Sequence, residues 1–85
     1  MGVNKMKTYG VTFDMKEGCT NCVEVHQVAT YRVTADAQRT FFHITVEADS
    51  SKNALVVAAL YIKKFIIDKA CNMANKVANM AMENY

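Results

Sequence analysis

Glycine and proline are confined to a small part of this chain. It contains no proline, and its three glycines all lie within the first 18 residues. From Cys19 onward, turns must be made by Asp, Asn and Ser, and long uninterrupted elements are favoured. No repeat, linker or low-complexity tract divides the 85 residues. We therefore expect one small domain over residues 1–85, near the lower size limit for folding on a hydrophobic core.

Apolar and polar residues alternate through the first half of the chain with the period of two that is typical of half-buried strands. The alternation predicts three strands, over residues 9–15, 23–35 and 40–48, with the second one bent near Gln27. The residues expected to face the core are apolar and share one parity within each strand: Tyr9, Val11, Phe13 and Met15; Val23, Val25, Ala29, Tyr31, Val33 and Ala35; Phe42, Ile44, Val46 and Ala48.

The second and third strands are expected to form a hairpin. A four-residue loop over 36–39 pairs Val33 with Phe42 and places Arg32 opposite His43 on the outer face. Both faces then match in character, which is what fixes the register of a strand pair.

A long helix is predicted to follow the third strand. Ser50 or Ser51 suits the N-cap, and the run from Ala54 is rich in helix formers. A continuous helix to the C-terminus would extend about 50 Å, well past a three-stranded sheet. The predicted fold is α+β: a three-stranded antiparallel sheet followed by one long helix, which packs on one sheet face and can bend near residues 68–72.

The predicted helix carries two adjacent apolar stripes, one more than packing on a sheet requires. A second copy of the same helix is the simplest cover for the extra stripe, so we expect self-association, as a dimer. A tail that folds back on its own sheet at residues 68–72 is the alternative. The residues assigned to self-association are apolar or small: Val56, Leu60, Ile67, Cys71, Met73, Ala74, Val77, Ala78 and Met80.

Two cysteines lie three positions apart, in what is expected to be a polar loop. With His26, Cys19 and Cys22 offer three side chains of the types that bind zinc. No second pair of ligands at such a spacing exists, and structural zinc sites usually take their ligands as two pairs. Ordinary loop thiols without a cofactor are therefore the simplest interpretation, with a zinc site or a redox pair as alternatives.

The sequence also bears on the compartment. An odd number of cysteines and an N-terminal stretch without an apolar signal core predict a reduced, cytoplasmic protein. The most apolar stretch, residues 54–67, is interrupted by Lys63 and Lys64 and is too short to span a bilayer. No membrane association is expected.

Catalysis finds little support in the residue pattern. The only serines, Ser50 and Ser51, are better explained as helix caps than as nucleophiles. No Gly-rich phosphate-binding loop exists, and carboxylates are sparse in the predicted sheet. We therefore expect a non-catalytic protein.

A binding or regulatory role agrees with more of the residues. We expect the outer sheet face and the adjoining turn to contact a macromolecular protein partner. Small stand-alone domains without cofactor motifs are common among phage and mobile-element proteins that inhibit host machinery, and such an inhibitor is one example of this role. The residues assigned to partner binding are Arg32, Asp36, Gln38, Arg39, Phe41 and His43.

Nucleic-acid binding is the alternative. Strands followed by a helix beginning "SSKNALVVAA" are similar to the end of a double-stranded-RNA-binding domain, although only Lys52 stands for that family's lysine cluster and its N-terminal helix has no counterpart. Arg32, Phe41 and His43 offer groups that stack on bases. Glu24 and Glu47, expected on the same face, oppose phosphate. The net charge of +2, concentrated after residue 50, does not decide the question.

Overall fold

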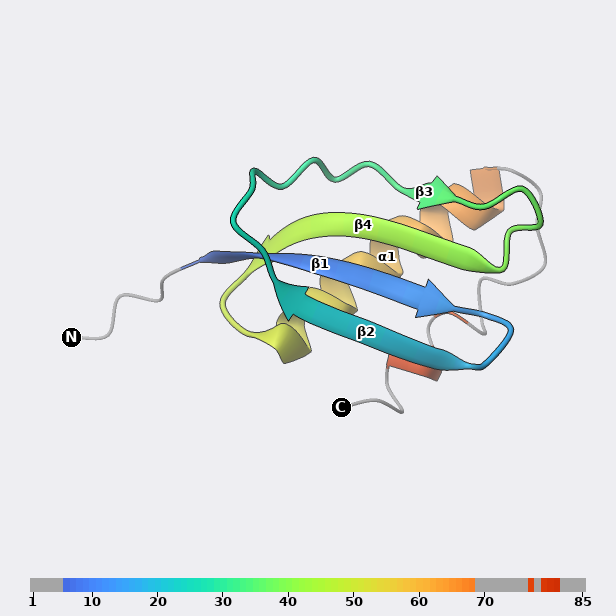
Figure 1. The fold of residues 1–85 in the computed structure, drawn as a ribbon, viewed down its shortest axis with the longest axis horizontal. Coiled ribbons are helices and arrows are strands. Elements are labelled where there is room, and N and C mark those ends of the chain that lie inside the picture. Colours follow the sequence, from blue (N-terminus) through green and yellow to red (C-terminus); the bar gives the residue numbers. More distant parts are fainter. Residues whose placement is uncertain (1–5, 69–76, 78, 82–85) are drawn as a thin grey trace.

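The chain forms an antiparallel sheet with one helix packed across it (Figure 1). The computed structural model describes residues 6–68, 77 and 79–81. Its elements are β1 (Lys7–Asp14), β2 (Cys19–Glu24), β3 (Thr34–Ala35), β4 (Phe41–Ala48) and α1 (Ser51–Asp68). The sheet order among these residues is β2-β1-β4-β3, with β1 and β4 at the centre. The α+β class is confirmed, with four strands where three were predicted.

The face of the sheet that α1 covers, here called the inner face, holds the hydrophobic core. Val11 and Phe13 of β1 lie in register with Ile44 and Phe42 of β4, and all four side chains are fully buried. From α1, Ala54, Ala58, Ile62 and Ile66 close over them at the spacing of one helix face. The predicted alternation of β1 and β4 is confirmed.

The predicted strand over residues 23–35 is wrong. The chain turns at residues 15–18, where the Asp14 carboxylate accepts the backbone N–H groups of Lys16 and Glu17, so β2 already begins at Cys19. Pairing with β1 sets Val23 opposite Gly10, on the face away from α1, and Val23 is 49% exposed. The alternation of β2 therefore runs opposite to the prediction.

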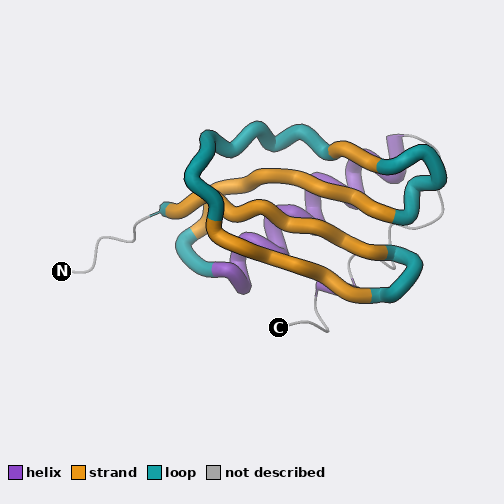
Figure 2. Tube along the Cα trace, in the orientation of Figure 1, coloured by secondary structure: helices purple, strands orange, loops and turns teal. Residues whose placement is uncertain are grey.

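Residues 25–33 form an irregular segment that leaves the end of β2 and runs along β4, as the teal trace in Figure 2 shows. Tyr31 anchors it: its N–H donates to the Thr45 carbonyl at 3.1 Å, and its hydroxyl accepts the Glu47 N–H at 3.2 Å. The Tyr31 ring packs on Tyr61 of α1, with 5.3 Å between centroids. These contacts hold a bulky residue at a φ of 52°, which such residues rarely adopt. The segment thus satisfies the edge of β4 without forming a strand.

The loop between β3 and β4 is longer than predicted, and the register differs by two residues. Ala35 pairs with Phe42 and Thr34 with His43, so the loop spans residues 36–40. The Asp36 carboxylate holds it by accepting the backbone N–H groups of Thr40 at 2.6 Å and Phe41 at 3.0 Å. A shift of two preserves the faces, and Val33, whose pairing with Phe42 was predicted, still packs against the core.

The start of α1 agrees with the prediction. Ser50 is the N-cap, since its side-chain oxygen accepts the Asn53 N–H at 3.2 Å. The predicted bend lies outside the described residues, apart from Asp68 at the end of α1. Val77, Met80 and Ala81 nevertheless belong to the buried core of this same chain.

Candidate functional site

A polar groove of about 450 Å³ lies on the outer face of the sheet, between residues 25–33 and β4. Its lining is made of Gln27, Thr30, Arg32, Thr34, His43 and Thr45, and it is called the outer groove below. It contains two of the predicted partner-binding residues, Arg32 and His43, and none of its lining residues is acidic. The outer groove is therefore a cationic, hydroxyl-rich surface.

The position of His43 is fixed by its neighbours on β1. Its Nδ1 shares a hydrogen bond of 2.9 Å with the Thr12 hydroxyl. The imidazole lies over Gly10: a Cβ there would make an ordinary contact of 3.5 Å with His43 Cε1 and a tighter one of 3.3 Å with Val25 Cγ1. The other ring nitrogen, Nε2, has no hydrogen-bond partner among the described residues. The ring is thus held at one nitrogen while the other remains available to a ligand.

The floor of the outer groove is pre-organised by a pair of threonines. Thr45 is only 4% exposed, although it lies on the face away from α1, because residues 25–33 cover it. Its hydroxyl accepts the Thr30 N–H at 3.1 Å and shares a second bond of 2.9 Å with the Thr30 hydroxyl. Buried polar groups whose hydrogen bonds are all made add rigidity and do not lower the stability of the fold.

The predicted partner-binding cluster is divided. Phe41 is 45% exposed on the outer face, beside His43, and Gln38 is exposed in the loop. Asp36 is engaged in the loop itself: the Thr40 hydroxyl, followed by the Phe41 N–H, lowers the pKa of its carboxyl below the ordinary value. Arg39 turns toward α1 and lies 6.0 Å from the centre of the Phe65 ring. The structure therefore brings Arg32 and His43 together in the outer groove, with Phe41 next to His43 on the same face of β4, and leaves Asp36 and Arg39 outside the groove.

The cysteines lie in strand β2, not in a loop as predicted. Cys19 pairs with Asp14 and Cys22 with Val11, so the two thiols point to opposite faces of the sheet. Burial raises the pKa of the Cys22 thiol, which donates to the Ser51 carbonyl at 3.7 Å. His26 lies beyond the strand. The two thiols are therefore not placed together on one side of the strand, as the zinc site or the redox pair considered above would require.

Metal ligands do not gather elsewhere in the described residues either. No group of three or more His, Cys, Asp or Glu side chains is arranged there to hold an ion. Cys71, the third cysteine, lies outside the described part of the chain.

The predicted self-association residues fall into three groups. Leu60 and Ile67 are 63% and 58% exposed on α1, and Val56 is half-buried beside them. Val77 and Met80 are buried in the core of their own chain, so they are not available to a second copy. The remaining assigned residues lie outside the described part: Cys71, Met73, Ala74 and Ala78.

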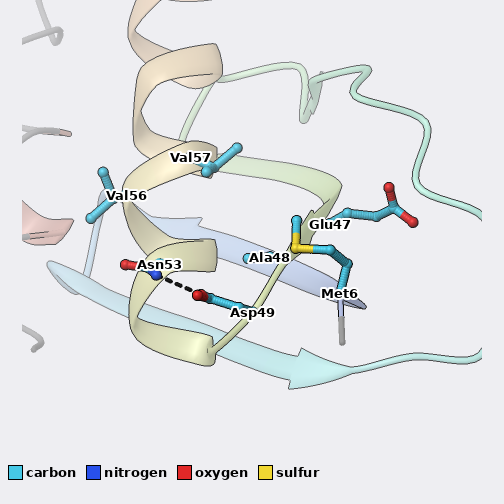
Figure 3. A pocket seen from close by; sticks show the side chains of 7 residues that line it. All are labelled: Met6, Glu47, Ala48, Asp49, Asn53, Val56 and Val57. Carbon is cyan, nitrogen blue, oxygen red and sulfur yellow. Dashed lines mark hydrogen bonds between the residues drawn. The ribbon is translucent and has the colours of Figure 1, made fainter. Parts of the chain in front are cut away.

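A second, more apolar groove lies beside the first turns of α1 (Figure 3). It has a volume of about 320 Å³ and is lined by Met6, Glu47, Ala48, Asp49, Asn53, Val56 and Val57. The Asn53 amide donates to the Asp49 carboxylate across it. Because Val56 lines this helix-side groove and also flanks Leu60, the groove adjoins the exposed face of α1.

Four residues of the outer groove were not predicted, Gln27, Thr30, Thr34 and Thr45, nor were Gly10 and Thr12, which contact His43 from β1. Their polarity on the outer face of β1 and β4 follows from the period of two. Nothing in the sequence indicates that residues 25–33 leave the ladder and form a wall beside them, apart from the polar pair His26 and Gln27 within an otherwise alternating run.

Comparison of the chain with family models, curated proteins and solved structures finds no match. Over residues 6–68, 77 and 79–81, no helix has both the length and the apolar character needed to cross a membrane. The geometry described above is accordingly the basis for any functional proposal.

Proposed function

We propose that this chain is a small, non-catalytic binding protein whose copies associate through α1 and whose outer sheet face engages a macromolecular partner. The observation that carries the proposal is the exposure of Leu60 and Ile67 on the solvent side of a helix that is already packed on its own sheet. The outer groove supports a binding role, because its lining contains an arginine, a fixed histidine and hydroxyls, but no carboxylate or cysteine.

The exposed apolar residues of α1 form one continuous surface. Leu60 and Ile67 are seven residues apart and project from the same side of the helix, with Val56 one turn before Leu60. Fully burying a leucine or isoleucine side chain is worth about 1.5–3 kcal/mol. A partner that covers both Leu60 and Ile67 would therefore gain binding free energy from apolar surface that stays exposed in a single copy.

Charge complementarity favours a second copy as that partner. Lys63 and Lys64 adjoin Leu60, and α1 carries no carboxylate before Asp68. The Asp49 carboxylate lines the helix-side groove at the other end of the helix, whereas the Glu47 carboxylate points away from it (Figure 3). Two α1 helices can pack antiparallel with their Leu60 residues at the centre. The lysines of each copy then face the helix-side groove of the other copy, so the two-fold symmetry gives two contacts between opposite charges.

The dimer is expected to be weak. An 18-residue helix is about 27 Å long, and one helix face with an adjoining groove buries less than the roughly 800 Å² per partner of a standard interface. We expect a dissociation constant in the micromolar range, as for small interfaces of this kind.

Sedimentation equilibrium of the wild type and of Leu60→Glu tests self-association. Leu60→Glu places a carboxylate and its symmetry mate at the centre of the pair, and we expect the dissociation constant to rise at least about tenfold. Gln38→Glu, which adds the same charge at an exposed position in the β3–β4 loop and not on α1, is the matched control and should leave dimerisation unchanged. A wild type that is monomeric at high micromolar concentration would contradict the proposal, as would a Leu60→Glu variant that dimerises normally.

A further inference from the structure

We infer that the outer groove, together with the adjoining Phe41 ring, binds single-stranded nucleic acid, with a phosphate at Arg32 and bases stacked on Phe41 and His43. The inference rests on the proposed role of the outer face in binding a macromolecular partner, and it names the class of that partner. It is independent of the association through α1, which lies on the opposite side of the sheet (Figure 1).

The two carboxylates that opposed nucleic acid in the sequence, those of Glu24 and Glu47, do not line the outer groove. Glu24 pairs in register with the buried Tyr9 and therefore points to the inner-face side, where its carboxylate lies 3.6 Å from Lys7 Nζ. Glu47 is in register with Thr8 on the outer-face side of β4, but it is not among the residues that line the outer groove. No carboxylate lines the outer groove itself, whereas Asp14 is in register with Phe41 and the Asp36 carboxylate accepts the Phe41 N–H. The phosphate is therefore placed at Arg32 and not beside Phe41.

Arg32 is the natural anchor for that phosphate. Its side chain is exposed, and it forms no ion pair with any described residue. A guanidinium presents its donors in a planar fork that matches two phosphate oxygens. Gln27, Thr30 and Thr34 add neutral groups able to donate to phosphate or sugar oxygens around it.

The two exposed rings are arranged as a stacking surface. Phe41 and His43 alternate with buried residues on β4, so they lie on the same face about 7 Å apart along the strand. The hydrogen bond shared with the Thr12 hydroxyl holds the imidazole in place. Aromatic rings on an open sheet face beside a cation are a recurring way to bind unpaired bases.

The same features argue against the other macromolecules. A base-paired duplex keeps its bases stacked inside, so it would use Arg32 and leave both rings uncovered. An acidic peptide would also use the arginine alone. Single-stranded nucleic acid is the partner whose phosphates and flat bases use both kinds of group.

Fluorescence anisotropy with labelled oligothymidylate and oligouridylate at about 50 mM salt tests the inference. We expect wild-type protein to bind both probes, and Arg32→Ala and Phe41→Ala each to weaken binding about tenfold. Phe41→Tyr should retain binding. The matched controls are Lys16→Ala, which removes an exposed cation in the β1–β2 turn, and Val23→Ala, which shortens an exposed apolar side chain of β2; both should bind as wild type.

The salt dependence gives a second readout. A single phosphate contact predicts that the logarithm of the binding constant falls with that of salt concentration with a slope of about −0.7, and Arg32→Ala should flatten this slope. The inference is overturned if wild type does not bind the probes, if duplex of equal length competes as well as single strands, or if Arg32→Ala and Phe41→Ala behave like their controls.

Poly-glutamate separates this failure from failure of the proposed function. If poly-glutamate binds and the oligonucleotides do not, and Arg32→Ala abolishes that binding, the outer face is a binding surface for an acidic protein partner and the nucleic-acid inference is wrong. Failure of Leu60→Glu to alter dimerisation would bear only on the association through α1.

Discussion

Phe41 and Phe42 are neighbours in β4, yet Phe41 is 45% exposed on the outer face and Phe42 is fully buried on the inner face. The inner face is regular, since α1 covers alternate residues of β1 and β4. The outer face owes its shape to an irregular segment, residues 25–33, which covers one side of β4 and leaves the rest open. The comparison separates a face that stabilises the molecule from one that is free to bind.

The largest expected effect is on the inner face. Phe42→Ala removes a fully buried ring that packs edge-on against Phe65, with centroids 6.0 Å apart. We expect a loss of about 3–5 kcal/mol in the free energy of unfolding, from lost burial and the cavity left behind. Phe41→Ala, the matched control one position away, should change it by about 0.5 kcal/mol or less. Urea denaturation followed by circular dichroism measures both, and equal losses would show that the two faces do not differ as described.

An intermediate effect is expected where the outer face is covered. Thr45→Val keeps the shape of the side chain but removes the hydroxyl that bonds the Thr30 N–H and hydroxyl. Leaving these groups without partners should cost about 1–3 kcal/mol in the free energy of unfolding. Thr34→Val, at an exposed threonine whose hydroxyl donates to the His43 carbonyl at a longer 3.4 Å, is the control and should cost less. An unaffected Thr45→Val variant would mean that residues 25–33 are not held by this pair.

The smallest effect is expected in the exposed loop that sets the register of β3 and β4. Hydrogen bonds from Thr40 and Phe41 lower the pKa of Asp36 in the folded state, so the ionised carboxylate stabilises the fold at neutral pH. That contribution is present above the unfolded pKa of about 4 and is lost as pH falls through the lower folded value. Asp36→Asn should therefore be less stable than wild type at pH 7, with the difference shrinking below about pH 4 in thermal denaturation profiles. A difference that grows in acid would contradict the role assigned to this carboxylate.

Much of the inner face could be predicted from the sequence, because burial of one side of a strand or helix makes apolar residues recur at a regular spacing. The faces of β1 and β4, and the cap of α1 at Ser50, follow from local rules. The faces of β2 could not be predicted in this way. The turn at residues 15–18 fixes how β2 pairs with β1, and this pairing, not the apolar pattern of β2, decides which side chains face the core. An edge strand tolerates an exposed Val23 and an inward-facing Glu24, so its pattern is a weak guide.

The candidate site was predicted in part, because the period of two also shows which residues of β4 lie on the outer face. Phe41 and His43 share the outer face because side chains alternate along β4, and Arg32 lines the outer groove from the irregular segment beside it. The supporting contacts are between residues distant in the chain, such as Thr12 with His43 and Thr30 with Thr45. No local pattern in one sequence records pairs of this kind.

The irregular course of residues 25–33 has a consequence for how such a molecule can change over time. Most of this stretch contributes no ladder hydrogen bonds to the sheet, and its main attachments are through Val25, Thr30 and Tyr31. Surface connections of this type accept insertions, deletions and altered charge far more readily than the elements they join. The wall of the outer groove can therefore diverge rapidly toward new ligands while the scaffold beneath it stays intact.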